Sequence, residues 1–454
     1  MLCHLILEQH PLMSVTPRLA LTPTERKASL SLAGLFAARM LGLFLLLPVF
    51  AVAAQGLVGG DDPAKVGLAL GMYGLTQAFM QIPFGLASDR WGRRPVVLFG
   101  LALFVAGSVI CALSNDVFWV TIGRAVQGAG AISAAVTAWL ADATRPEVRT
   151  RAMAMVGGSI GLSFALSLVA APLIVGWGGL SGLFWTIALL GVVCIAVAGW
   201  VVPVVAPSPK PVKPARPMEV IAHTDLLRLN FGVFCLHLVQ VALFVAIPPL
   251  LIKLGDLTAF SLWKVYLPVI LGSFVLMVPV IFMTEKRRAH RQALRFAVAG
   301  MVIVLALLPW ASQGLITLAL GLTGFFVMFN VLEALQPSLV SRVAPPELKG
   351  LALGFYNTSQ AVGLFLGGAV GGALLQADGP DAVFLGAAAL TALWLLVTFA
   401  LTWFARDINQ VVILGFPLGF YMAAQGALVI YLGIIWWYNR RMRKLDAEFG
   451  SEDE

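Results

Sequence analysis

Four ionisable side chains lie deep inside apolar stretches of this chain, where chemistry beyond packing is expected. They are Arg39, Arg124, His237 and Glu333. A charge at the centre of a membrane-spanning helix costs about 2.5–3.5 kcal/mol on insertion scales, so each should face a polar cavity or a partner. Burial favours the neutral form of a carboxyl group and a nearby arginine favours the charged form, which suits Glu333 to gaining and losing a proton. We predict a proton-coupling group of these four residues; the alternative is a set of permanent ion pairs and hydrogen bonds between helices.

Polar side chains recur at helical spacing around these positions. Tyr73, Gln77 and Gln81 follow one another every four residues, and such a stripe in an apolar run is typical of a helix face that lines a cavity. The alternative is a bond between helices, which is worth about 0.6 kcal/mol. The residues predicted to line a substrate cavity are Tyr73, Gln77, Gln81, Gln127, Gln240, Asn330, Gln336, Tyr356, Asn357 and Gln360.

The segments that position these residues are long apolar helices. Hydrophobic residues make up 60% of the chain and charged residues only 11%, whereas a soluble domain carries roughly 25% charged residues. Continuous apolar runs of about 20 residues predict membrane-spanning helices rather than the alternating strands of a barrel. The runs lie near 28–54, 66–88, 95–114, 117–142, 152–176, 180–205, 228–252, 260–284, 292–311, 314–340, 350–375 and 381–405.

A segment rich in Pro and Lys divides these runs into two sets of six. It covers residues 206–227 and reads as a cytoplasmic linker between two bundles. We predict an all-α membrane protein with an N-terminal tail at 1–27, six-helix bundles at 28–205 and 228–405, and an extra C-terminal hydrophobic helix with a charged tail at 406–454. The substrate site is expected at mid-membrane between the bundles.

The net charge of +8 is concentrated in short loops rather than on one surface. The basic loops at 89–94, 145–151, 206–227, 285–291 and 342–350 fall on one side of the membrane when crossings are counted from a cytoplasmic N-terminus. This is the positive-inside pattern. It predicts a multi-pass protein of a bacterial inner membrane and argues against a nucleic-acid partner.

Motifs for catalysis are missing from the sequence. There is no GxxxxGK[ST] nucleotide loop, no HExxH pair and no cluster of Cys and His. We therefore predict no enzymatic activity, no cofactor and no metal, and ion gradients as the energy source.

A thirteenth apolar run at 411–439 ends in the basic segment RRMRK. If the run spans the membrane, that segment lies on the outer face, against the charge rule. A re-entrant or interfacial placement is the alternative. The helix-breaking GFPLG at 415–419 predicts a bend near its start.

Two motifs resemble those of the major facilitator superfamily. GLASDRWGRRPVVL (85–98) is similar to the loop signature between helices 2 and 3, with Ala87 departing from it, and IGRAVQGAGA (122–131) is similar to the helix 4 motif. The resemblance implies two six-helix bundles that rock in alternating access. It also implies a conformational latch in which Asp89 approaches the N-terminal end of helix 11 and pairs with basic residues of its loop. The latch residues are Gly85, Asp89, Arg90, Gly92, Arg93, Arg94, Asp142 and Arg149.

Further segments resemble two narrower groups. FNVLEALQPSL (329–339) and KGLALGFYNTSQAVG (349–363) resemble the YajR-like drug:proton antiporters, although Ala171-Pro172 replaces the Gly-Pro pair of antiporters. GFPLGFYMAAQG (415–426) and RRMRKLDAEFG (440–450) resemble the small subunit of sodium/solute symporters. The first resemblance implies export in exchange for protons, and the aromatic-rich, sparsely charged interiors of the runs predict small amphipathic or hydrophobic compounds as the substrate. The alternatives are a proton-coupled importer of the same fold, or an accessory subunit that binds a sodium-dependent symporter through residues 408–454.

Overall fold

The computed structural model describes residues 21–203, 223–287, 289–344, 348–400 and the short segments 412–413 and 416–417. Contacts divide the chain into two units, residues 1–392 and 393–454. The first unit contains every residue predicted above to act in proton coupling, the cavity or the latch. The predicted run at 411–439 lies outside the described residues except for a two-residue antiparallel pairing of β1 (Val412–Ile413) with β2 (Phe416–Pro417).

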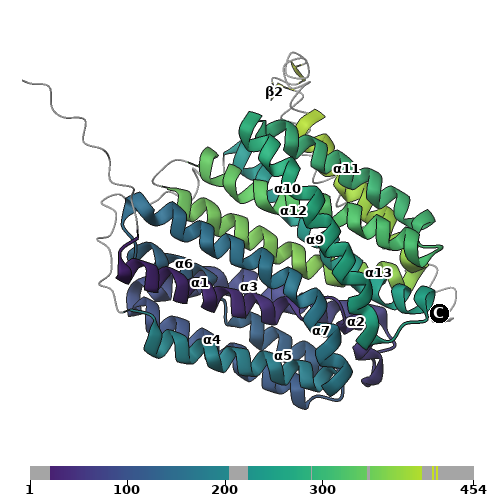
Figure 1. Cartoon of the computed structure of the whole chain (residues 1–454), viewed down its shortest axis with the longest axis horizontal. Coiled ribbons are helices and arrows are strands. Elements are labelled where there is room, and N and C mark those ends of the chain that lie inside the picture. The colour runs from purple at the N-terminus through teal and green to yellow at the C-terminus, as the bar shows by residue number, and fades with distance from the viewer. Residues whose placement is uncertain are drawn as a thin grey trace, which may run out of the picture. The chain divides into compact units, whose positions relative to one another are not determined.

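The N-terminal half is a bundle of long helices (Figure 1). Its elements are α1 (Pro23–Phe44), α2 (Phe50–Ala53), η1 (Ala54–Gly56), α3 (Pro63–Trp91), α4 (Arg93–Leu113), α5 (Val117–Ala129), α6 (Ser133–Asp142), α7 (Pro146–Ala196) and the π-helical turn η2 (Val197–Val201). Helix α1 packs on α7, and α4 packs on both α5 and α7.

The C-terminal half repeats this layout. Its elements are α9 (Thr224–Gly255), η3 (Ala259–Leu262), α10 (Trp263–Arg287), α11 (His290–Ala311), α12 (Leu315–Val343), α13 (Lys349–Leu395) and the π-helical turn η5 (Leu396–Ala400). Helix α9 begins at Thr224, inside the range 206–227 assigned to the linker. Helix α12 packs on α9, α10 and α11.

Capping residues and glycines explain where several of the helices begin and bend. Thr22 and Glu25 form a capping box at the start of α1, which satisfies backbone N–H groups that have no partner inside the helix. Asp62 caps α3 and Asp116 caps α5 in the same way. Gly179 in α7 has φ 63° and Gly379 in α13 has φ 79°, a region that favours glycine, so each long helix contains two of the predicted runs.

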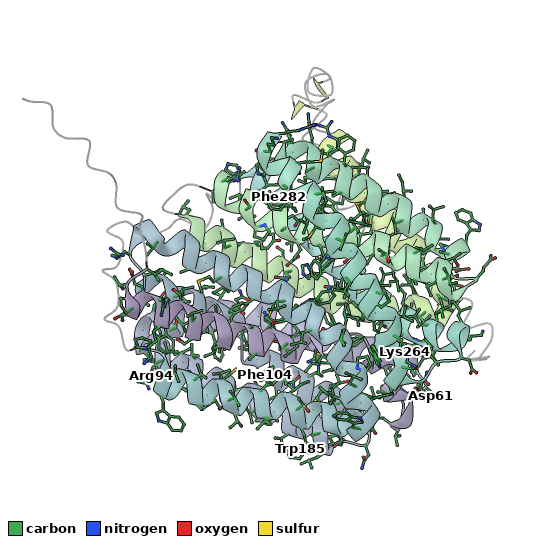
Figure 2. The ribbon with its side chains drawn as sticks, in the orientation of Figure 1. Asp61, Arg94, Phe104, Trp185, Lys264 and Phe282 are labelled. Carbon is green, nitrogen blue, oxygen red and sulfur yellow. The ribbon has the colours of Figure 1, made fainter. Side chains whose placement is uncertain are left out.

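The spans found in the described residues agree with the predicted architecture. Eight helices are long and apolar enough to cross a membrane, among them α7 and α13 with their internal kinks. Helix α3 corresponds to the predicted run 66–88, and α5 with α6 corresponds to 117–142. The loops at 89–94 and 145–151 mark what we call the basic end of the helices, and the turns at 57–62 and 256–258 mark the opposite end. Figure 2 shows Arg94 at the basic end and Asp61 at the opposite end.

The two halves are in close contact at the opposite end. A Cβ built on Gly67 or Gly71 of α3 would clash with backbone carbonyl oxygens of Gly368 or Phe365 in α13, so backbones approach here as only small residues allow. The Tyr266 hydroxyl of α10 donates to the carbonyl oxygen of Pro48 over 3.3 Å. Toward the basic end, Gly157, Gly158, Gly161, Gly350 and Gly354 show no such close approach, because a Cβ there would meet no atom within 4 Å.

Candidate functional site

Two arginines and a tyrosine form the polar centre of the N-terminal half. The guanidinium carbon of Arg39 (α1) lies 5.8 Å from the centre of the Tyr73 ring (α3), and that of Arg124 (α5) lies 4.8 Å from the same centre. Both arginines are 1% exposed. Such cation–π contacts strengthen when they are desolvated, so the ring holds both charges in the interior.

Neutral side chains accept some of the hydrogen bonds that the two guanidinium groups can donate. Arg39 Nη1 donates to Ser133 Oγ over 2.9 Å. Arg124 Nη1 donates to Gln127 Oε1 over 2.7 Å, and Gln127 Nε2 donates to Ser108 Oγ over 2.7 Å. The spacing of three between Arg124 and Gln127 puts both on one helix face.

Several polar atoms of Arg39, Arg124 and the α3 stripe have no hydrogen-bond partner among the described residues. They are Nε and Nη2 of Arg39, Nε of Arg124, the Tyr73 hydroxyl, Gln77 Oε1 and both amide atoms of Gln81. An unsatisfied buried donor or acceptor costs about 1–3 kcal/mol. The stripe predicted on α3 therefore faces the interior of the protein, and its polar groups are not consumed by bonds between helices.

A histidine, a carboxylate and an amide meet in the C-terminal half. His237 Nε2 (α9) lies 3.6 Å from Glu333 Oε2 (α12) and 2.7 Å from Gln360 Nε2 (α13). His237 is 2% exposed, while the Glu333 side chain is 26% exposed.

The hydrogen bonds fix the chemistry of this histidine. His237 Nδ1 lies 3.1 Å from the carbonyl oxygen of Val233, which can only accept, so Nδ1 carries a proton. In the neutral ring Nε2 then accepts from the Gln360 amide, and in the protonated ring Nε2 donates toward Glu333. The three side chains therefore connect α9, α12 and α13 through polar contacts.

The other predicted cavity residues of the C-terminal half are interior but less connected. Asn330 Nδ2 donates to Ser273 Oγ over 3.2 Å. Gln240, Gln336 and Tyr356 are buried and carry oxygen or nitrogen atoms without a protein partner. Asn357 is half-buried on α13.

Sequence reasoning missed a phenylalanine cluster between the halves. The ring of Phe164 (α7) lies 5.2 Å from Phe44 (α1), 6.2 Å from Phe244 (α9) and 5.8 Å from both Phe326 and Phe329 (α12), centre to centre. His237 contacts Phe329 at 5.9 Å. No sequence signal separates these rings from the other apolar residues of such a chain.

The predicted latch residues gather around Arg93. Its Nε donates to Asp142 Oδ2 over 2.9 Å, and its Nη1 donates to Asp89 Oδ1 and to Ser88 Oγ. Asp89 is 55% exposed, and its described contacts stay within the N-terminal half. Of the remaining latch residues, Gly92 has φ 95° in the turn before α4, Gly85 is half-buried, Arg90 is exposed, and Arg94 is half-buried. The Arg149 side chain lies outside the described residues.

A second ion pair joins the start of α1 to the α6–α7 turn. Glu25 Oε1 accepts from Arg145 Nε over 2.8 Å and from its backbone N–H over 3.0 Å, and Glu25 Oε2 accepts from Arg145 Nη2 over 3.1 Å. The sequence presented Arg145 only as part of a basic loop. The sequence signal that could have indicated this contact is the pairing of Glu25 with Thr22 at the start of α1.

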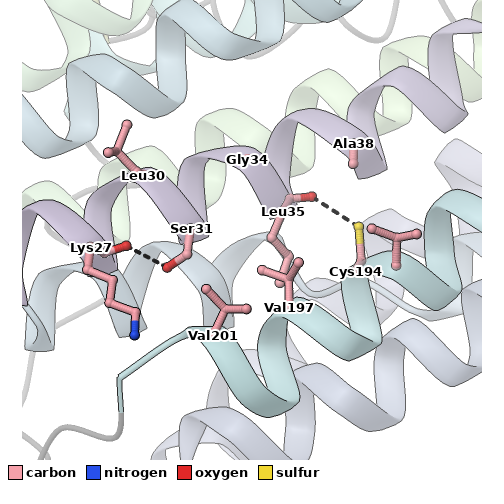
Figure 3. A pocket seen from close by; sticks show the side chains of 10 residues that line it. Lys27, Leu30, Ser31, Gly34, Leu35, Ala38, Cys194, Val197 and Val201 are labelled. Carbon is pink, nitrogen blue, oxygen red and sulfur yellow. Dashed lines mark hydrogen bonds between the residues drawn. The ribbon is translucent and has the colours of Figure 1, made fainter.

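An apolar groove of about 510 Å³ runs between α1 and the last turns of α7 with η2. Its lining includes Leu30, Leu35, Val197 and Val201, with Lys27 at one end (Figure 3). It contains none of the predicted site residues.

Comparison with known proteins decides the family. Residues 30–368 match the Major Facilitator Superfamily. The chain belongs to this family. It is 45% identical over 383 residues to the inner membrane transport protein YajR of Escherichia coli K12, covering 83% of this chain and 84% of that protein. It is 32% identical over 351 residues to the uncharacterized transporter BU466 of Buchnera aphidicola, covering 76% and 89%.

The family membership confirms the predicted class. The protein is a multi-pass transporter of the bacterial inner membrane and not an enzyme. A stretch of 141 residues, 31% of this chain and 34% of the relative, is 32% identical to the class B tetracycline resistance protein of Escherichia coli. Solved structures share the fold: a D-xylose-proton symporter has TM-score 0.66 at 15% identity, covering 83% of this chain and 97% of that chain. The nucleoside transporter NupG has TM-score 0.64 at 13% identity, covering 82% and 99%.

The C-terminal end matches a different family. Residues 385–452 match a domain of unknown function, DUF4212. The match begins inside α13, within the last predicted run of the second bundle. The sequence prediction of a distinct C-terminal segment therefore agrees with a separate family match, which also includes most of the last predicted run of the second bundle.

Proposed function

We propose that this transporter exports small amphipathic or hydrophobic compounds in exchange for protons by alternating access. The observation that carries the proposal is the contact of His237 Nε2 with Glu333 Oε2 at 3.6 Å and with Gln360 Nε2 at 2.7 Å. Within this group the Glu333 side chain is partly exposed and the His237 side chain is buried. A proton can therefore arrive at Glu333 and be shared with His237.

The sharing is tied to the packing of three helices. His237, Glu333 and Gln360 come from α9, α12 and α13. Protonation of His237 turns its Nε2 from an acceptor into a donor toward Glu333, so the amide N–H of Gln360 loses its acceptor. A change of protonation thus changes the bonds between helices, which is what coupling a proton to a conformational change requires. Arg39 and Arg124 contribute positive potential from the other half.

The packing of the halves supports an inward-open conformation for this structure. The halves touch at the opposite end through the close approach of α3 and α13, and Gly157, Gly158, Gly161, Gly350 and Gly354 toward the basic end show no such approach. The positive-inside rule places the basic end in the cytoplasm. In the outward-open state we propose that Asp89 binds the N-terminal end of α13, where the helix dipole favours an anion, with Arg93 and Asp142 orienting it.

The cluster around Phe164 supports an apolar substrate. It lies between α1, α7, α9 and α12, and rocking of the halves would separate its rings and offer their faces to a ligand. The similarity to the class B tetracycline resistance protein favours export over import.

The test uses inside-out vesicles with an acidified lumen and a panel of neutral, cationic and anionic fluorescent compounds. The wild-type protein is expected to accumulate at least one compound against its gradient. Glu333→Gln should abolish accumulation and keep exchange of the same compound across the membrane without a gradient. Asp225→Asn is the matched control, since Asp225 pairs with Arg228 over 2.8 Å and is 59% exposed.

Two results would contradict the proposal. One is accumulation by Glu333→Gln at the wild-type level. The other is movement of compounds only together with protons, which would favour the importer of the same fold.

A second candidate function concerns the C-terminal segment. Its separate family match at residues 385–452 supports a role apart from the bundles, and we propose that residues 408–454 bind a sodium/solute symporter. Co-purification of such a symporter with the full chain, lost on deletion of 408–454, is the expected result. Full transport activity of the truncated chain without any lost partner would refute the role.

A further inference from the structure

The interior of the N-terminal half carries two positive charges and no negative one among its described side chains. Arg39 and Arg124 flank the same ring and are both 1% exposed. The described carboxylates of this half are engaged or exposed elsewhere. Glu25 pairs with Arg145, Asp62 with Lys65, and Asp89 and Asp142 with Arg93, while Asp116 caps α5 and Asp61 is exposed in a turn.

The two guanidinium groups retain free donors. The described groups that bind Arg39 and Arg124 are a serine, a methionine sulfur, a glutamine and a backbone carbonyl, all of them neutral. Among the described residues, Nε and Nη2 of Arg39 and Nε of Arg124 have no partner. The planar fork of a guanidinium matches the oxygens of a carboxylate, phosphate or sulfonate, and a buried charge is tolerated only when it is paired.

The other half does not offset this charge. Its described carboxylates within the predicted runs are Glu333, which lies against His237, and Asp381, which is exposed at the first position of the run 381–405. A cationic compound would approach two like charges, whereas an anionic compound would meet unsatisfied donors and opposite charge.

We propose that the transported compound carries an anionic group, which binds between Arg39 and Arg124 beside Tyr73. The inference rests on the proposed transport function and adds the charge class of its substrate. The compound is an organic anion, because the cluster around Phe164 provides apolar surface for its body. The donors are sealed in this conformation, so the anion binds when α1, α3 and α5 rearrange, and binding stabilises the rearranged state.

The test compares three ligands with the same apolar body on the purified full chain. They are 2-naphthoate, 2-naphthylmethanol and 2-naphthylmethylammonium, which carry a negative, zero and positive charge. Only 2-naphthoate is expected to raise the thermal unfolding temperature in a saturable way. Equal or greater stabilisation by the alcohol or the ammonium compound, or no stabilisation by 2-naphthoate, overturns the proposal without any variant being needed.

Variants locate the site. Arg39→Gln and Arg124→Gln should each weaken 2-naphthoate binding at least tenfold, while Arg228→Gln, at the start of α9, should leave it unchanged. Wild-type affinity in both Arg39→Gln and Arg124→Gln overturns the assignment. The unfolding measurement uses no proton gradient, so it tests the anion site separately from proton coupling. Loss of coupled transport in Glu333→Gln together with retained selectivity for 2-naphthoate supports both the proposed function and the anion site. Absence of charge selectivity with intact coupling refutes only the anion site.

Discussion

Adding one methyl group at Gly74 should open the end at which α3 meets α13. A Cβ at Gly74 would lie 2.5 Å from the carbonyl oxygen of Ala361 and 3.0 Å from Leu364 Cβ, so the helices must move apart by several tenths of an ångström. Overpacking of this kind costs about 1–3 kcal/mol. Because the clash exists only while this end is closed, Gly74→Ala should shift the equilibrium toward the other state by about 5- to 150-fold.

The helix propensity of alanine does not disturb this reasoning. Alanine favours a helix over glycine by roughly 0.5–1 kcal/mol, but the residue is helical in either state and the gain cancels. Gly354→Ala is the matched control, since Gly354 also lies in a helix and an added Cβ meets nothing within 4 Å.

The assay is labelling by a membrane-impermeant maleimide applied to intact cells. Ala246→Cys in α9 is the reporter, because Ala246 is 2% exposed. The native Cys111, Cys194 and Cys235 are buried, and Cys3 is replaced by serine. Labelling of the reporter should accelerate 5- to 150-fold with Gly74→Ala. An unchanged rate, or an equal acceleration with Gly354→Ala, would refute the reasoning.

Substitutions at three further positions test individual contacts by the thermal unfolding of purified protein. Tyr73→Phe should leave the free energy of unfolding nearly unchanged, because the Tyr73 hydroxyl has no partner among the described residues. Tyr73→Leu removes the ring that contacts both arginines and should lower the free energy of unfolding by about 1–2 kcal/mol. Equal effects of the two substitutions would contradict the cation–π assignment. Gly179→Ala should destabilise by about 1–3 kcal/mol because φ is 63° there, and Gly178→Ala, which meets no atom within 4 Å, is its control. Glu25→Gln should lower the free energy of unfolding by about 1 kcal/mol. The loss is kept small by solvent screening, because the Arg145 side chain is 48% exposed. A loss no larger than that of Asp225→Asn would show that the Glu25–Arg145 pair stabilises the fold no more than an exposed ion pair does.

The helices were predictable because each apolar run must satisfy its own backbone in lipid. The runs 152–176 and 180–205 appear in the structure as α7, divided at Gly179, and 350–375 and 381–405 as α13, divided at Gly379. The interior placement of Tyr73, Gln77 and Gln81 followed from their spacing.

The partners of these residues were not predictable. Arg39 binds Ser133, which is 94 positions away, and nothing in the sequence indicates which helices become neighbours. The cluster around Phe164 was hidden for the same reason, since one phenylalanine in an apolar run resembles any other. In the sequence, Arg145 was interpreted only as part of a basic loop that sets the membrane orientation. Its ion pair with Glu25 depends on where α1 begins in the folded protein.

The two halves share their irregular backbone features but not their chemistry. Gly179 and Gly379 break α7 and α13 with nearly the same dihedral angles, and π-helical turns follow at Val197–Val201 and Leu396–Ala400. Such matching irregularities are expected of two halves related by an internal repeat. Under the proposed function the N-terminal half supplies fixed positive charge and the C-terminal half the proton-carrying group, so a hybrid made of two N-terminal halves would lack the proton carrier.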